Sequence, residues 1–151
     1  MAKRYLLNKF AETFPISSVD FYIKYKKKYL LAKRNNYPAK NKFACIGGII
    51  KKNESIKKNC NRILKKELKL KASKKLKLIN INKFCFNTNF CGNKKKTEYV
   101  SVGFFLRLNK KEFGSIKINK EHSMIKLFTK NELIKNKQVI NQLKNAFKSG
   151  L

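Results

Sequence analysis

The sequence predicts an α/β domain with a mixed β-sheet, and three observations support this prediction. Residues 18–26 alternate between apolar and polar side chains and include aromatic ones, which is typical of a strand. Residues 54–68 carry apolar side chains at helical spacing, which indicates a helix. Strand and helix patterns interleave along the chain after an initial hairpin, as expected when helices cover a mixed sheet.

The N-terminal part predicts a short helix, three strands and a loop. Residues 5–13 have an amphipathic helical pattern that stops before a proline. The strand at 18–26 turns back through lysines into a second strand at 28–34, which makes a hairpin. Residues 35–42 have the asparagines and proline of a loop, and the apolar segment 43–48 is a short strand that ends in a glycine pair.

The rest of the chain predicts two helical segments and three further strands. The helix at 54–68 has an asparagine or a serine available to cap its start. Longer strands follow around 77–87 and 97–108, separated by a polar turn that contains a glycine. A last strand at 123–129 leads into a helical segment at 130–147.

Length and cysteine content point to one ordinary domain. The chain has 151 residues, of which 42% are hydrophobic, enough for a single core. No apolar run approaches the roughly 18 residues of a membrane span, and the first residues do not form a signal peptide. The four cysteines make no Cys-x-x-Cys pair and there is one histidine, so a zinc cluster is not expected. We expect a cytoplasmic protein, without a membrane partner, whose cysteines are buried or half-buried free thiols.

Charge is the most unusual feature of the composition. The chain has 38 lysines and arginines against 8 acidic residues, a formal net charge of +30. Nearly all of the basic residues are lysines, and they are spread along the whole chain. Because recognition of bases and bidentate binding of phosphates favour arginine, nucleic acid is not expected as a partner despite this charge. We expect a solvated cationic surface that attracts anions.

A spaced set of residues then suggests a specific family. Gly48, Glu54, Arg62 and Glu67 follow the pattern Gly-x5-Glu-x7-Arg-x4-Glu. This pattern resembles the box of the Nudix hydrolases, which cleave nucleoside diphosphates linked to another moiety. The resemblance implies a Nudix fold, an α/β/α sandwich with a mixed β-sheet, as a single domain over residues 1–151. The preceding glycine pair is expected to make a tight turn from strand to loop.

The box is incomplete. Where the family has Arg-Glu-U-x-Glu-Glu, with U a bulky aliphatic residue, the chain has Arg62-Ile63-Leu64-Lys65-Lys66-Glu67. Two of three carboxylates are therefore missing, and the closing glycine of the box is a lysine at position 69. The chain is either a decayed Nudix scaffold or a member of a branch that works with one metal ion.

Two further stretches resemble one such branch, the GDP-mannose mannosyl hydrolases. They are PISSVDFYIKYKKKYLLAKRNNYPAKNKFACIGG at 15–48 and KEHSMIKLFTKNEL at 120–133. The resemblance implies hydrolysis of a GDP-sugar such as GDP-mannose or GDP-glucose, by attack of water at the anomeric carbon with inversion. The products are GDP and the free sugar. It also implies one Mg²⁺ per active site, for which Mn²⁺ can substitute.

The resemblance assigns the metal ligands and the base. Gly47, through its backbone carbonyl, Glu67 and Glu121 would hold the metal, and Glu121 stands where the branch has glutamine. His122 would be the general base, and an imidazole, with a reference pKa of about 6.5, suits that role near neutral pH. One expected arginine is replaced by Ile49, for which a nearby lysine is an imperfect substitute.

The remaining assignments concern substrate and support. Asp20 would contact the sugar, whereas Arg34 and Tyr99 would contact the diphosphate. Glu54 and Arg62 would form a structural pair that braces the helix and its preceding loop. Taken singly, each residue has an ordinary explanation, such as sheet packing for Tyr99, so the joint pattern carries the interpretation.

Three functional classes stay open. The first is the sugar nucleotide hydrolase, and the second is a Nudix pyrophosphatase that attacks phosphorus. The third is a non-catalytic, basic protein that binds polyanions on a Nudix scaffold. The branch also implies a homodimer in which the N-terminal segment, residues 1–14, packs on the partner.

Overall fold

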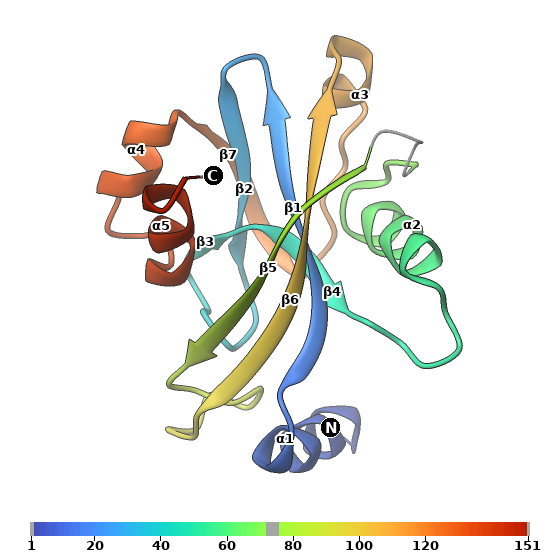
Figure 1. Cartoon of the computed structure of the whole chain (residues 1–151), viewed down its shortest axis with the longest axis vertical. Coiled ribbons are helices and arrows are strands. Elements are labelled where there is room, and N and C mark those ends of the chain that lie inside the picture. Colours follow the sequence, from blue (N-terminus) through green and yellow to red (C-terminus); the bar gives the residue numbers. More distant parts are fainter. Residues whose placement is uncertain (1, 72–75, 151) are drawn as a thin grey trace.

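The computed structural model describes residues 2–71 and 76–150, in which a mixed β-sheet lies between helices (Figure 1). Within these residues the strands are β1 (Ile16–Tyr25), β2 (Lys28–Arg34), β3 (Phe43–Ala44), β4 (Ile46–Ile49), β5 (Lys77–Phe86), β6 (Thr97–Leu108) and β7 (His122–Phe128). The main path of the sheet is β3-β2-β1-β6-β5, while β4 pairs with β1 and β7 pairs with β2. The predicted α/β class with a mixed sheet is confirmed.

Helices cover both faces of this sheet (Figure 1). They are α1 (Ala2–Thr13), α2 (Ile56–Leu68), α3 (Lys110–Gly114), α4 (Lys130–Lys135) and α5 (Asn141–Lys148). The apolar side of α2 packs into one core cluster, whereas α4 and α5 contribute to a second cluster on the opposite face. Helices α2, α4 and α5 thus bury their apolar sides against the sheet, as the periodicity of their sequences requires.

Strand β1 organises the sheet and the site. It runs parallel to β6 along its whole length, and its other edge is shared by β4 and β2, both antiparallel. Because side chains alternate, Val19 and Phe21 enter the cluster under α2, whereas Tyr22 enters the cluster under α5. Asp20, between them, lies directly opposite Gly47 of β4. The middle of the sheet therefore carries a carboxylate beside a glycine.

The structure confirms the predicted hairpin of β1 and β2 and corrects two other segments. The single strand predicted at 43–48 is divided into β3 and β4. The helical segment predicted at 130–147 is interrupted at 136–140, because this stretch pairs with the sheet: Phe43 N donates to the carbonyl of Gln138, and Ile140 N donates to the carbonyl of Phe43. Helix α3 was not predicted, and its capping box explains its formation.

The N-terminal helix α1 lies at the end of the sheet where β1 begins (Figure 1). Asn8 Oδ1 accepts a hydrogen bond from the backbone of Phe90 at 3.0 Å, which ties the helix to the β5–β6 connection. Leu6, Phe10 and Phe14 are more than half exposed. They offer an apolar surface, and the predicted homodimer stays a prediction.

Two further expectations concern membranes and cysteines. None of the helices in residues 2–71 and 76–150 is long and apolar enough to cross a membrane. All four cysteines are free, as predicted, but the expected burial is wrong for Cys85 and Cys91, which are exposed.

Candidate active site

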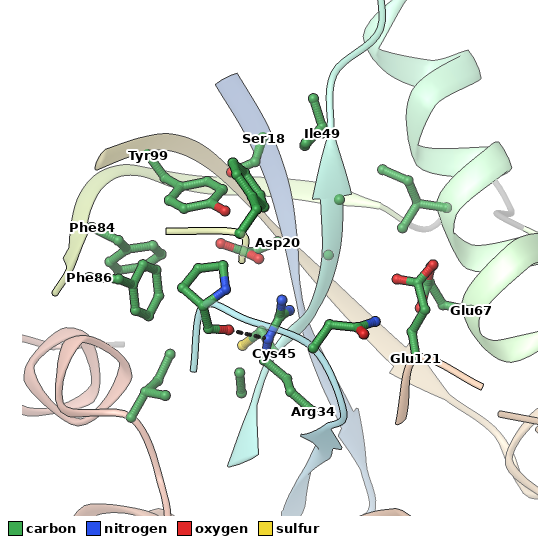
Figure 2. A pocket seen from close by; sticks show the side chains of 18 of the residues that line it. Ser18, Asp20, Arg34, Cys45, Ile49, Glu67, Phe84, Phe86, Tyr99 and Glu121 are labelled. Atoms are coloured by element: carbon green, nitrogen blue, oxygen red, sulfur yellow. Dashed lines mark hydrogen bonds between the residues drawn. The ribbon is translucent and has the colours of Figure 1, made fainter. Parts of the chain in front are cut away.

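A pocket of about 520 Å³ opens beside strand β4. Seven of the nine site residues assigned by the resemblance line it, namely Asp20, Arg34, Gly47, Arg62, Glu67, Tyr99 and Glu121. Figure 2 shows Glu67 and Glu121 on one side of β4, and Phe84, Phe86 and Tyr99 on the other. We call the first side the charged end of the pocket and the second side its aromatic end. The charged end consists of Lys66, Glu67 and Glu121, and the aromatic end of Phe84, Phe86, Phe90 and Tyr99.

Gly47 is required by the carboxylate next to it. A Cβ atom at this position would lie 2.2 Å from Asp20 Oδ1 and 2.5 Å from the backbone oxygen of Val19, so a side chain cannot be accommodated without moving β1. The tight turn expected at Gly47 and Gly48 is wrong, because both lie inside β4 and pair with β1. Glycine is present here for close approach of two strands, not for a turn.

Asp20 presents a carboxylate to the middle of the pocket (Figure 2). Its Oδ2 accepts a hydrogen bond from Ser101 Oγ at 2.6 Å. Burial raises the pKa of Asp20 to about 6, although the Ser101 bond and the charge of Arg34 act in the opposite direction. Arg34 is itself held by a hydrogen bond from its Nε to the carbonyl of Pro38 at 2.9 Å. A carboxylate that titrates near neutral pH is therefore available at this point.

The charged end is a chain of paired groups. Glu67 is almost fully buried, with 4% of its side chain exposed, and its Oε2 lies 2.8 Å from His122 Nε2. Its Oε1 accepts a hydrogen bond from Lys66 Nζ at 3.2 Å, and the same ammonium donates to Glu121 Oε1. Burial would raise the pKa of Glu67, but the His122 bond and the Lys66 charge outweigh it and lower the pKa.

His122, the predicted general base, does not line the pocket, and neither does Glu54. His122 begins β7, opposite Arg34 of β2, and it is buried. Nε2 faces Glu67, and Nδ1 is buried without a hydrogen-bond partner among the described residues. In this arrangement the His122 ring contacts the Glu67 carboxylate. The role of His122 as general base stays a prediction.

Glu54 precedes helix α2 and forms an ion pair with Arg62, which lies in the middle of that helix. Arg62 Nε is 2.8 Å from Glu54 Oε2, and its Nη2 donates to the carbonyl of Ile49 at 3.1 Å and to Asn59 Oδ1. Ser55 caps the helix by accepting from the backbone of Lys58. Arg62 therefore connects helix α2, strand β4 and the loop between them, residues 50–55, which we call the box loop.

The aromatic end is built by the pairing of two strands. Phe84 of β5 lies opposite Tyr99 of β6, and the Tyr99 ring contacts Phe86 edge-on at 5.6 Å between centroids. Phe90 contacts the same ring at 6.2 Å, and burial raises the pKa of Tyr99. These phenylalanines were not predicted from the sequence as site residues. Phe84 and Phe86 could have been found from their spacing of two residues in β5, which places both rings on the face of the sheet that Tyr99 occupies.

The mixed sheet between helices, with a pocket lined by residues of α2 and β4, is the arrangement that the resemblance to Nudix hydrolases implied. The NUDIX domain family model matches residues 16–148, so the chain belongs to the family of Nudix hydrolases. Similar solved structures include the MutT protein from Methanosarcina mazei Go1, with 17% identity and a TM-score of 0.70 over 91% of this chain and 94% of that one. The NUDIX domain of Shewanella oneidensis NrtR complexed with ADP ribose has 16% identity and a TM-score of 0.65, covering 99% and 96%. A C. elegans Ap4A hydrolase has 14% identity and a TM-score of 0.63, covering 88% and 93%. At these identities the likeness shows the fold alone.

Nudix hydrolases generally use a divalent metal, typically Mg²⁺. The expected ligands Gly47, Glu67 and Glu121 do line the pocket. However, both oxygens of Glu67 and one of Glu121 are engaged by Lys66 and His122. In the part of the chain that the structure describes, no group of three or more histidine, cysteine or acidic side chains gathers to hold a metal ion. These residues do not fit a divalent ion in the arrangement observed.

Proposed function

We propose that this chain hydrolyses a sugar linked to a nucleoside diphosphate, with GDP-mannose as the first compound to test. The observation that carries the proposal is the division of one pocket into an aromatic end and a charged end on the two sides of β4. A nucleobase suits the aromatic end, since every base has a face that stacks on an aromatic ring. The diphosphate and sugar then extend toward Asp20 and the charged end.

Three basic residues in the lining suit a diphosphate. They are Arg34, Lys51 and Lys66, which come from β2, the box loop and α2. Ile49, which replaces an arginine expected from the resemblance, also lines the pocket, so Lys51 is placed to compensate in part. Charge from these side chains favours the diphosphate as a leaving group when its bond to the sugar breaks.

Asp20 is the base that the pocket itself offers. Its carboxylate takes a proton from water as the water oxygen bonds to the anomeric carbon, and the bond from that carbon to the diphosphate oxygen breaks. The pKa of about 6 allows the carboxylate to be ionised at neutral pH and still accept a proton. The resemblance instead names His122, which reaches the pocket only through Glu67.

Attack at phosphorus is the second candidate. One similar structure is a complex with ADP ribose and another is an Ap4A hydrolase, and both compounds contain phosphoanhydride bonds that attack at phosphorus would cleave. The box here lacks two carboxylates, at Ile63 and Lys66, which makes a cluster of several metal ions unsuitable. This loss favours attack at carbon.

The test is incubation with GDP-mannose in oxygen-18 water, with and without Mg²⁺, with products read by phosphorus NMR and mass spectrometry. GDP with the label on free mannose supports the proposal, whereas GMP with mannose phosphate assigns the chain to the pyrophosphatases. Folded protein that gives no product, but binds polyanions with a steep salt dependence, belongs to the third class.

Substitutions identify the base in the same assay. Asp20→Asn should lower the rate by about 100-fold or more if Asp20 is the base. A comparable loss in His122→Ala, with Asp20→Asn nearly unaffected, would instead support the role implied by the resemblance. Glu12→Gln is the control, because Glu12 is exposed and pairs with Lys95 outside the pocket.

A further inference from the structure

Lys66 lies where the family pattern has a carboxylate, and its ammonium joins two others. It donates to Glu67 Oε1 at 3.2 Å and to Glu121 Oε1, whose residue lies 55 positions further along the chain. We infer that Lys66 is the resident cation of this site, occupying the position between Glu67 and Glu121 that a divalent metal would need. The chain then binds a nucleoside diphosphate without a metal ion.

The donor set supports this inference. A hard divalent cation takes about six oxygen ligands, which compete poorly if they are already neutralised. Of the four carboxylate oxygens of Glu67 and Glu121, Lys66 holds one from each residue and His122 Nε2 faces a third. The pKa of Lys66 is raised, because the bonds and charges of the two glutamates outweigh the effect of partial burial. Lys66 therefore stays charged at neutral pH.

The second missing carboxylate has also been replaced by a residue with a structural task. Ile63 stands at that position, is buried, and belongs to the core cluster under β4. Its Cδ1 would lie 3.1 Å from a Cβ added to Gly48, so the side chain fills the space against the strand. The two positions that would complete a metal site have thus become an ion pair and a core contact.

An ammonium in this position can also contact substrate. A lysine has three N–H donors, of which two are directed at Glu67 and Glu121, and the third suits a phosphate oxygen. The Lys66 side chain is 54% exposed and lines the pocket, so a ligand can reach it. This second role rests on the proposed function, whereas the first does not.

The test measures binding of Mn²⁺ alone, by the loss of the EPR signal of the free ion, in wild type and in Lys66→Met and Lys66→Glu. The wild type should show no binding below about millimolar Mn²⁺, whereas Lys66→Met should bind the ion. Lys66→Glu should bind Mn²⁺ at least about tenfold more tightly than Lys66→Met, because an added carboxylate ligand raises affinity. Lys65→Met and Lys65→Glu are matched controls, since Lys65 is exposed and does not line the pocket; they should behave as wild type. Submillimolar binding by the wild type that Lys66→Met leaves unchanged would overturn the inference.

A second measurement addresses the ligand. With EDTA present, calorimetry should show GDP binding to the wild type, weakened by about tenfold in Lys66→Met and by less than about twofold in Lys65→Met. GDP binding that requires Mg²⁺ in the wild type would contradict the metal-free role. Because the Mn²⁺ experiment uses no nucleotide, a protein that excludes Mn²⁺ but binds no GDP would refute the proposed function and leave the assignment of Lys66 as the resident cation standing.

Discussion

The two ends of the pocket are held together by different forces. At the charged end, Lys66, Glu67 and Glu121 neutralise one another across a helix and a distant loop. At the aromatic end, Phe86 and Tyr99 meet because two neighbouring strands are paired. Ion pairs depend on pH and salt, whereas ring contacts depend little on either. Changes of conditions and single substitutions should therefore separate the two ends.

The largest effect on stability is expected at the ion pair of Glu54 and Arg62, since Arg62 belongs to the same helix as Lys66 and Glu67 of the charged end. Arg62→Ala should lower the free energy of unfolding by about 3 kcal/mol, because Glu54 is left as an unpaired, mostly buried charge and the carbonyl of Ile49 loses its donor. Urea unfolding measures this change. Arg107→Ala is the control, since Arg107 is exposed, and it should cost less than about 0.5 kcal/mol. Equal losses of unfolding free energy in the two variants would show that the ion pair of Glu54 and Arg62 does not stabilise the fold.

An intermediate effect is expected at Asp20, between the two ends. Its pKa rises from 3.8 to about 6 on folding, so the protonated form favours the fold. The stability that Asp20 contributes is complete below about pH 3.8 and is lost as the pH rises through 6. The shift corresponds to at most about 3 kcal/mol at pH 7.5. Asp20→Asn should be more stable than the wild type by about 2 kcal/mol at this pH, because an amide reproduces a protonated carboxyl only in part.

The measurement is the difference in free energy of unfolding between wild type and Asp20→Asn, followed from pH 4 to pH 7.5. Glu67 changes in the opposite sense, because its lowered pKa makes its contribution disappear as the pH falls below the ordinary glutamate pKa of 4.5. Glu67 is present in both proteins, so its contribution cancels in the difference. A difference that does not vary with pH would contradict the shifted pKa of Asp20.

Local patterns were sufficient to predict most of the fold. Alternation predicted β1, β2, β5 and β6, and helical spacing predicted α2, because each of these elements buries one face of its own sequence. The break at 136–140 could not be predicted in this way, since it depends on pairing with Phe43, which lies far away in the chain. Similarly, Lys69 adopts a left-handed conformation at the end of α2, with φ of 58°, where the box pattern has glycine.

The site was predictable only as far as its spacing pattern extended. The pattern located Glu54, Arg62 and Glu67, and the structure shows how differently the two glutamates are used: one pairs with arginine, the other with lysine and histidine. The loss of a carboxylate at Lys66 was visible in the sequence, but not the contact of its ammonium with Glu121. That contact depends on the path of the loop before β7, which no local pattern specifies.

The smallest effect is expected at the aromatic end, and it should be insensitive to salt. Phe86→Ala should weaken GDP binding by about tenfold, or roughly 1.4 kcal/mol, because a base loses one stacking surface. Phe14→Ala is the matched control, since Phe14 is exposed and lies outside the pocket. Calorimetry at low and high salt measures both variants. The loss in Phe86→Ala should be the same at both salt concentrations, whereas the loss in Lys66→Met should shrink as salt screens the ammonium. A Phe86→Ala effect that vanished at high salt would mean that the base does not stack there, and that charge alone holds the nucleotide in this pocket.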